Sequence, residues 1–191
     1  MDIVLASQSP RRRELLERMG LDFRIIVPDI DEHMDRSLPP DKLVEAISAE
    51  KAAAVAAQVG PEAVVIAADT VVAWNGEILG KPADEAHARE MLSHLSGQDH
   101  HVYTGFTVRR GEKSVTRSEC SLVTFRPLTG EELEAYVRSG EPMDKAGAYG
   151  IQGLGSLFVE GIRGDYFNVM GLPVCHLGQV LKEFGVYCLS V

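Results

Sequence analysis

Three consecutive arginines at the predicted start of the first helix could bind a phosphate group. Residues 1–6 are short and mainly apolar, which predicts a buried strand. Ser9 and Pro10 then suit the N-cap and the first position of a helix. The run Arg11–Arg13 falls in the first helical turn, where the positive end of the helix dipole costs each cation about 0.3–1 kcal/mol. Guanidinium groups and free backbone N–H groups at one helix start favour a polyanion, and the alternative is a solvated surface turn.

Two carboxylates are candidates for acid–base or metal chemistry. Asp69 comes at the end of the strand predicted over residues 63–67, the most hydrophobic in the chain, and before a second strand over residues 70–74. A carboxylate there is partly desolvated and rigidly held, which suits a metal ligand or a general base, whereas the structural alternative is a turn residue. Glu32 lies in an acidic loop over residues 28–40, and such loops are usually just solvated.

Two lysines and a glycine-rich segment complete the polar candidates. Lys81 stands between Gly80 and Pro82, and Lys51 lies in a long predicted helix. Isolated lysines are usually surface residues, so these two become phosphate ligands only if the fold brings them close to the arginines. The segment 150–155 resembles a glycine-rich nucleotide loop, but it does not connect an early strand to a helix as a Rossmann motif does.

Helical and strand patterns alternate along the chain, and Asn75-Gly76 is typical of a two-residue hairpin turn. Their mixture predicts an α/β fold with a mixed sheet, although it does not give the order of the strands. We expect helices over residues 10–19, 41–58, 84–95, 131–138 and 172–184, strands over 1–6, 23–27, 63–67, 70–74, 77–79, 102–109, 115–125 and 157–162, and a glycine-rich loop over 143–155.

The composition sets limits on the class of protein. The 191 residues are enough for one domain with a real core, or for two small lobes around a cleft. The formal net charge of -9 argues against broad binding to DNA or RNA, although a small nucleotide needs only a local basic pocket. No apolar run approaches the ~20 residues of a membrane span, and the N-terminus does not match a signal peptide. The 3 widely spaced cysteines form no CxxC motif, so we expect reduced thiols, no membrane association and a cytoplasmic location.

Short motifs spread over the whole chain combine into one pattern. They are Leu5-Ala6-Ser7-Gln8-Ser9-Pro10-Arg11-Arg12, Glu50-Lys51-Ala52, Ala68-Asp69-Thr70-Val71-Val72, Gly80-Lys81-Pro82, Tyr103-Thr104-Gly105, residues 144–155 and Gly171-Leu172-Pro173. In this combination the chain resembles the Maf family, the septum-formation-type nucleotide pyrophosphatases. The resemblance extends over nearly the whole chain in order, and no position expected to be catalytic departs from it.

The resemblance implies both an activity and a fold. The activity is hydrolysis of nucleoside triphosphates to the monophosphate and pyrophosphate, with a divalent metal, Mg²⁺ or Mn²⁺. The fold is a single domain over residues 1–191, similar to the inosine-triphosphate pyrophosphatases: an elongated mixed sheet flanked by helices, with two lobes around a cleft. A nucleoside triphosphate as substrate and a homodimer follow from the same resemblance.

The resemblance also suggests roles for individual residues. Asp69 matches the catalytic carboxylate of the family, which is described as the proton acceptor. Our hypothesis is that Asp69 and Glu32 hold the metal on the triphosphate while an activated water attacks the α-phosphorus, and it leaves open whether Asp69 is base, ligand or both. The expected phosphate ligands are Arg12, Lys51, Lys81, and Ser7 together with the helix start that follows it.

Three further positions match the subfamily that acts on dTTP and UTP, namely Arg11, Thr70 and Gln152. The sister group that acts on 7-methyl-GTP has Trp, Gln and Glu in these places. Physical chemistry supports the difference, because Trp would stack on a cationic methylated purine and Glu would complement its charge. A neutral Gln offers one donor and one acceptor, which suits the edge of uracil or thymine.

Two other functions remain open at this point. One is a non-catalytic regulator of cell division that binds a protein or a nucleic acid, which the acidic net charge disfavours for nucleic acid. The other is a pyrophosphatase for 7-methyl-GTP or other purine nucleotides, which Arg11, Thr70 and Gln152 disfavour. These residues leave room for modified pyrimidines such as 5-methyl-UTP or pseudo-UTP.

Overall fold

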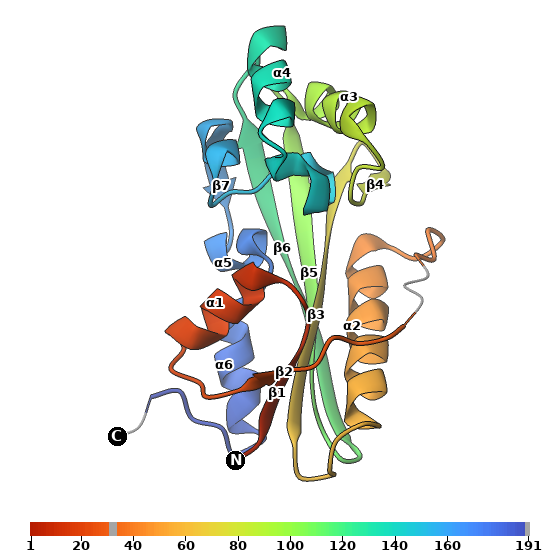
Figure 1. Ribbon diagram of the computed structural model, residues 1–191, viewed down its shortest axis with the longest axis vertical. Coiled ribbons are helices and arrows are strands. Elements are labelled where there is room, and N and C mark those ends of the chain that lie inside the picture. Colours follow the sequence, from red (N-terminus) through yellow and green to blue (C-terminus); the bar gives the residue numbers. More distant parts are fainter. Residues whose placement is uncertain (31–33, 190–191) are drawn as a thin grey trace. The chain divides into compact units, whose positions relative to one another are not determined.

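The apolar strand at the beginning of the chain lies inside a mixed sheet (Figure 1). The computed structural model describes residues 1–30 and 34–189. Their strands are β1 (Ile3–Ala6), β2 (Arg24–Ile25), β3 (Val64–Trp74), β4 (Glu77–Leu79), β5 (Asp99–Arg110), β6 (Lys113–Phe125) and β7 (Val159–Arg163). The sheet order is β2-β1-β3-β5-β6-β7, with β4 paired to β3. Because β1 runs parallel to β2 and β3, whereas β4 and β7 run antiparallel to their partners, the predicted mixed sheet is confirmed.

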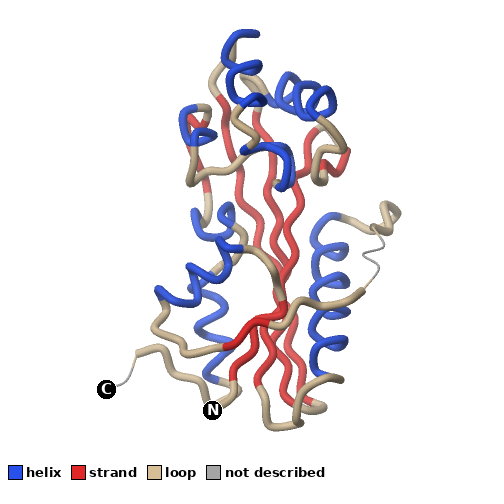
Figure 2. Tube along the Cα trace, in the orientation of Figure 1, coloured by secondary structure: helices blue, strands red, loops and turns tan. Residues whose placement is uncertain are grey.

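Helices and short 3₁₀ turns connect these strands (Figure 2). The helices are α1 (Pro10–Arg18), α2 (Pro40–Ala56), α3 (Glu85–Leu95), α4 (Gly130–Arg138), α5 (Tyr166–Met170) and α6 (Val174–Lys182). The 3₁₀ turns are η1 (Glu141–Asp144), η2 (Ala146–Ala148) and η3 (Leu154–Leu157). All of the predicted helices are present, and the short α5 is an addition. None of the helices described is long and apolar enough to cross a bilayer.

The described chain divides into two units, each with its own core. Unit 1 takes residues from Met1–Asp69, Thr104–Glu119 and Gly171–Val191, and unit 2 from Thr70–Tyr103 and Cys120–Met170. The strands β3, β5 and β6 each contribute residues to both units. The expected single domain, its elongated shape and the cleft stay predictions.

In unit 1, helix α2 packs against alternate residues of the parallel strands β1 and β3. Val65 and Ala67 share one face of β3 because successive strand residues point to opposite faces. They form a buried cluster with Ala52 and Val55 of α2, and α2 lies on one side of the unit 1 strands while α1 and α6 lie on the other (Figure 1). At Gly105 of β5 the strand and α2 nearly touch, since a Cβ there would lie 2.6 Å from the backbone nitrogen of Glu45.

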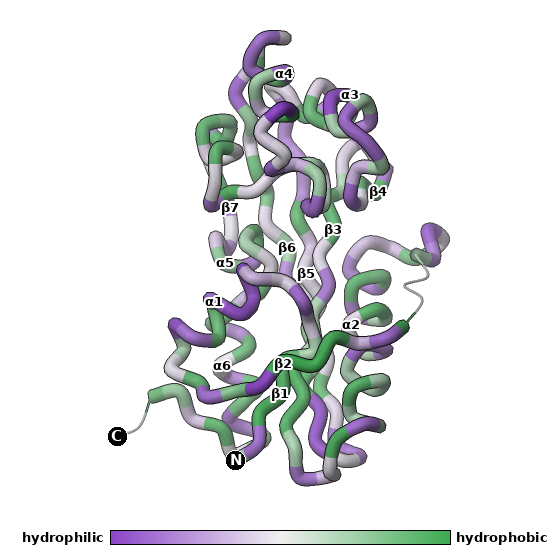
Figure 3. Tube along the Cα trace, in the orientation of Figure 1, coloured by the Kyte–Doolittle hydropathy of each residue, from purple (hydrophilic) through white to green (hydrophobic). Residues whose placement is uncertain are grey.

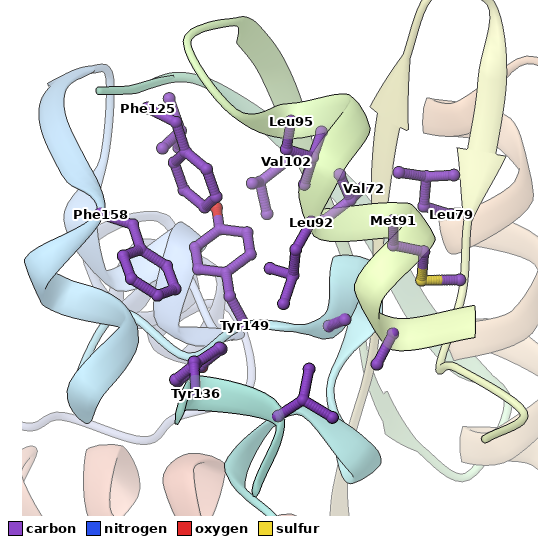
Figure 4. Close-up of a cluster of buried hydrophobic side chains, with 14 residues drawn as sticks. Val72, Leu79, Met91, Leu92, Leu95, Val102, Phe125, Tyr136, Tyr149 and Phe158 are labelled. Carbon is purple, nitrogen blue, oxygen red and sulfur yellow. The ribbon is translucent and has the colours of Figure 1, made fainter. Parts of the chain in front are cut away.

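Unit 2 has an aromatic and aliphatic core (Figure 4). Phe125, Tyr149 and Phe158 lie close together with edge-to-face ring contacts, and Leu92 of α3 packs beside them. The predicted Asn75-Gly76 turn is confirmed, because both residues have positive φ angles, 50° and 79°, as a two-residue hairpin requires.

Three local predictions differ from the structure. Asp69 does not separate two strands but lies within the single strand β3. An ionised side chain is tolerated inside a strand when it is paired, and Asp69 is paired with Lys51. The strand expected over residues 23–27 is limited to β2, and the loop expected over residues 143–155 contains 3₁₀ turns.

Candidate active site

The turn from β1 into α1 has the geometry expected from the sequence. Most of α1 is hydrophilic, in contrast to β1 before it (Figure 3). Ser9 occupies the N-cap position with Pro10 as the first helical residue, as predicted, although no side-chain hydrogen bond from Ser9 caps the helix. The backbone N–H of Ser9 instead donates to Oγ of the buried Ser7, 3.2 Å away. Backbone N–H groups at a helix start have no partner within the helix, so they suit an anion such as phosphate.

The three arginines of this turn have different surroundings. Arg12 donates from Nε to the carbonyl oxygen of Gly171 at 2.8 Å and from Nη1 to Oγ of Ser7 at 3.4 Å. Arg13 is exposed and pairs with Glu17 one helical turn later. Arg11 is half-buried in the same turn. The structure therefore brings Arg12 and Ser7 together, as the phosphate-binding prediction requires.

A nearly buried ion pair lies at the junction of α2 and β3. Lys51 donates from Nζ to Oδ1 of Asp69 at 2.7 Å, and the two side chains are 8% and 13% exposed. Asp69 continues the face of β3 that carries Val65 and Ala67, and Lys51 lies one helical turn before Val55. The packing that buries these apolar residues also places the ammonium group against the carboxylate.

Hydroxyl groups anchor α2 one turn before Lys51. The buried Ser48 shares a hydrogen bond of 2.9 Å with Thr107 of β5, and Thr107 shares another of 2.9 Å with Thr116 of β6. Gly105, two residues before Thr107, allows the close approach of α2 to β5. Together these contacts set the position of α2, and with it the position of Lys51 relative to Asp69.

The remaining predicted ligands, Thr70, Lys81 and Gln152, belong to unit 2. Lys81 is exposed after β4, and Gln152 is exposed in the glycine loop, residues 150–155. Gly147, which leads into this loop, donates its N–H to the carbonyl oxygen of Gly80 at 3.1 Å. The segment that precedes Gln152 is thus bonded to the segment that carries Lys81. Thr70 follows Asp69 directly along β3.

Known proteins resemble this chain over nearly its whole length. The family profile described as "Maf-like protein" matches residues 2–184. The chain belongs to the Maf family. It is 54% identical over 187 residues to a protein of Moorella thermoacetica named dTTP/UTP pyrophosphatase, a match that covers 96% of this chain and 95% of the relative. A protein of the same name from Bacillus cereus is 50% identical over 184 residues, which are 96% of each chain.

Among solved structures, a HAM1 protein from Coxiella burnetii has a similar fold. Its TM-score is 0.56 at 18% sequence identity, and the match covers 96% of this chain and 99% of that one. At this level of identity the likeness concerns the fold alone. It confirms the expectation of a mixed α/β fold similar to the inosine-triphosphate pyrophosphatases.

Asp69 is the one expected metal ligand that lies among the described residues 1–30 and 34–189. Glu32, the second expected ligand, lies outside the described residues. In residues 1–30 and 34–189 no group of three or more His, Cys, Asp or Glu side chains is arranged to hold a metal ion. Mg²⁺ commonly takes only one or two protein carboxylates and completes its shell with water and phosphate oxygens, so the hard oxygen of Asp69 fits such an ion.

Two contacts of the site were missed by the sequence analysis. The carbonyl of Gly171 accepts the hydrogen bond of Arg12, and the hydroxyl of Ser48 anchors α2. The motif Gly171-Leu172-Pro173 belongs to the family resemblance, but the sequence suggested no role for its residues. Its buried glycine has a φ of 120°, which few other residues adopt. No sequence pattern marks Ser48 as part of the site, because serine is a common residue in helices.

Proposed function

We propose that this chain hydrolyses dTTP and UTP to the monophosphate and pyrophosphate. The observation that carries the proposal is the nearly buried Lys51–Asp69 pair in a chain that brings Arg12, in the first turn of α1, to the hydroxyl of Ser7, which lies just before that helix. A rigidly held carboxylate can accept a proton, and the helix start can bind a polyanion. The names of the relatives from Moorella thermoacetica and Bacillus cereus support the choice of substrate.

In the proposed reaction, a water oxygen forms a bond to the α-phosphorus. The bond from the α-phosphorus to the oxygen that links it to the β-phosphorus breaks. The proton of the attacking water passes to the carboxylate of Asp69, and pyrophosphate leaves with the bonding electron pair. Lys51 holds the carboxylate in place through its hydrogen bond to Oδ1. An ammonium group carries three donors, so this bond is compatible with the further role of Lys51 as a phosphate ligand.

The remaining phosphate contacts are assigned by residue type. Arg12 and Ser7 bind phosphate oxygens together with the N–H groups at the start of α1, and Lys81 adds a further positive charge. Asp69 is also the proposed ligand of Mg²⁺ or Mn²⁺, with Glu32 as a second one. A bound divalent cation would neutralise phosphate charge and lower the pKa of a coordinated water.

Selection of the base is assigned to Arg11, Thr70 and Gln152. Gln152 offers one donor and one acceptor to the edge of uracil or thymine. The three residues are those of the dTTP/UTP subfamily, so 7-methyl-GTP and a purely regulatory role are not favoured. A homodimer, a cytoplasmic location and the lack of nucleic-acid and membrane partners are further parts of this proposal, taken from the family resemblance and the composition.

An assay of pyrophosphate release tests the proposal. The protein is incubated with dTTP, UTP, CTP, the purine triphosphates and 7-methyl-GTP, each with and without Mg²⁺ or Mn²⁺. We expect metal-dependent release of pyrophosphate, rather than phosphate, from dTTP and UTP. Activity on 7-methyl-GTP alone would overturn the assignment of the selecting residues, and inactivity on every nucleotide would overturn the function.

A further inference from the structure

The glycine loop takes its conformation from two side chains of its own unit. Tyr136 belongs to α4 and Glu141 to η1, and both lie in unit 2 with residues 150–155. Within the loop, the N–H of Gly153 reaches the carbonyl of Gly150 only at 3.4 Å. Contacts from outside the loop therefore matter for the position of Gln152.

The carboxylate of Glu141 accepts hydrogen bonds from two adjacent residues of the segment after Gln152. Oε2 accepts the N–H of Leu154 at 2.9 Å, and Oε1 accepts the N–H of Gly155 at 3.0 Å. Oε1 also accepts the hydroxyl of Tyr136 at 2.8 Å. Hydrogen bonds to an ionised acceptor are stronger than those between neutral groups, so this carboxylate is a firm anchor for the backbone.

The hydroxyl of Tyr136 extends the anchor to Gly150, the first residue of the glycine loop. It accepts the N–H of Gly150 at 3.1 Å while donating to Glu141. The Tyr136 ring is buried, in edge-to-face contact with Phe158 at a centroid distance of 4.8 Å (Figure 4). Glu141 and Tyr136 together thus bind the backbone on both sides of Gln152.

The loop wraps so closely around these groups that side chains are excluded at its glycines. A Cβ on Gly153 would lie 2.6 Å from Cδ of Glu141, and one on Gly155 would lie 2.8 Å from the hydroxyl oxygen of Tyr136. A Cβ on Gly150 would lie 2.6 Å from Cε of Lys145. Glu141 therefore explains Gly153, Tyr136 and the carbonyl oxygen of Gly150 explain Gly155, and the side chain of Lys145 crowds Gly150, without any contact with a phosphate.

The charge of Glu141 is supported by its surroundings. Burial raises the pKa of the carboxyl, but the hydrogen bonds of Gly155, Leu154 and Tyr136 and the nearby ammonium of Lys145 outweigh it and lower the pKa. Lys145 is itself tied to this segment, because its Nζ donates to the carbonyl oxygen of Glu141 at 2.7 Å.

We propose that Glu141 and Tyr136 are positioning residues for base selection, which hold the glycine loop in the conformation that presents Gln152 to a pyrimidine. This inference rests on the proposed function, and it adds two residues that touch neither the base nor the phosphates. Their loss weakens binding of the base while leaving the phosphate contacts and the reacting carboxylate intact.

Two conservative variants test the proposal. Tyr136→Phe keeps the ring against Phe158 and removes only the hydroxyl. Glu141→Gln keeps the size of the side chain but puts an amide donor where a backbone N–H needs an acceptor. The matched controls are Tyr166→Phe and Glu131→Gln, which change exposed residues of the same unit.

Three readouts separate positioning from general damage to the fold. In both variants we expect hydrogen exchange at the loop amides to rise about tenfold, and KM for UTP to rise about tenfold while kcat changes less than about threefold. The inhibition constant of tripolyphosphate, which carries no base, should stay within about twofold of that of the unchanged protein. The controls should show none of these changes.

Other results would overturn the proposal. Unchanged exchange at the loop amides would show that Glu141 and Tyr136 do not hold the loop. A parallel loss of affinity for UTP and tripolyphosphate would show a structural role only. If the unchanged protein releases no pyrophosphate from any nucleotide, the proposed function fails and base selection with it, whereas the exchange result alone still decides whether these residues hold the loop.

Discussion

Asp69 and Gln152 are held in place by different means. Asp69 lies inside the 11-residue strand β3 and pairs with a lysine of the 17-residue helix α2. Gln152 lies in a glycine loop whose backbone is bonded to the side chains of Glu141 and Tyr136. The residue proposed to do the chemistry is thus placed by regular secondary structure, and the residue proposed to select the base is placed by side chains.

This difference has a physical consequence. The backbone ladder of a strand and the hydrogen bonds of a helix do not depend on single side chains, so the Lys51–Asp69 geometry tolerates most surface substitutions. A loop held by one carboxylate and one hydroxyl is sensitive to both, and it can be retuned by few changes. Binding and specificity residues are common on loops that a rigid scaffold positions.

The largest effect is expected from removing the reacting charge in the regular region. Asp69→Asn keeps the shape of the side chain and an oxygen for Lys51, but it abolishes the proton acceptor. We expect kcat for dTTP to fall about a thousandfold, within the range for general-base catalysis, while the protein still folds with a lower thermal midpoint, because the nearly buried ammonium of Lys51 loses its ionised partner. Steady-state kinetics and thermal unfolding measure both quantities. The exposed Asp22→Asn is the control, and an Asp69→Asn enzyme of full activity would remove Asp69 from the chemistry.

A substitution at the contact of α2 with β5 should break the regular region itself. Gly105→Ala places a Cβ 2.6 Å from the backbone nitrogen of Glu45, so α2 must shift and Lys51 with it. We expect the free energy of unfolding to fall by about 3 kcal/mol, together with a loss of activity. The control is Gly130→Ala in α4, where nothing lies within 4 Å of the added Cβ and the same change should be neutral or stabilising. Equal stability of the two variants in denaturant unfolding would contradict the close packing.

The contact of His100 with Tyr149, the residue before the glycine loop, predicts how the free energy of unfolding depends on pH. Tyr149 shares a hydrogen bond of 2.7 Å with Nε2 of His100, and burial lowers the pKa of His100 to about 4. The unfolded chain takes up this proton near pH 6.5, so between these values it binds more protons than the folded chain and stability falls with falling pH. This group alone should remove roughly 3 kcal/mol between about pH 7 and 4.

His100→Gln keeps an acceptor for Tyr149 but does not titrate. We expect the free energy of unfolding of this variant to change less between neutral and acidic pH than that of the unchanged protein. The exposed neighbour provides the control, since burial is the larger cause of the low pKa of His100 and the charge of His101 the smaller one, so His101→Gln should keep most of the pH dependence. Identical pH profiles for His100→Gln and the unchanged protein in denaturant titrations would show that His100 is not held neutral by burial.

The smallest effect is expected from exchanging the three selecting residues, because this change should alter the preference among bases and leave the reaction itself intact. The triple variant Arg11→Trp, Thr70→Gln and Gln152→Glu should shift the ratio of kcat/KM for 7-methyl-GTP over UTP by about tenfold or more. Pyrophosphate release on the two nucleotides measures the ratio. An unchanged ratio would refute the assignment of base selection to these positions.

The regular elements could be predicted from the sequence, because local patterns determine them. The alanine-rich stretch over residues 41–58 predicted α2, and the continuous apolar run over residues 63–67 predicted the first half of β3. The Ser9-Pro10 start of α1 followed from capping rules. The interruption expected at Asp69 was wrong since the partner that permits a charge inside β3 lies 18 residues away in α2. No local pattern contains such a pairing.

For the same reason, the contacts that complete the site could not be predicted from the sequence. Arg12 and Gly171 are 159 positions apart, and only the fold brings them together. The glycines at 150, 153 and 155 were visible as a motif and resembled a nucleotide loop. The structure gives them another reason, since they make room for Glu141, Tyr136 and Lys145, none of which had a signal of its own.

The position of water attack is the most direct test of the account. Hydrolysis of dTTP in water enriched in heavy oxygen, followed by mass spectrometry of the products, shows which phosphorus is attacked. Attack at the α-phosphorus, with Asp69 as the proton acceptor, predicts the label in dTMP and none in pyrophosphate, and almost no labelled product from Asp69→Asn. Label in pyrophosphate or in free phosphate would contradict the proposed reaction.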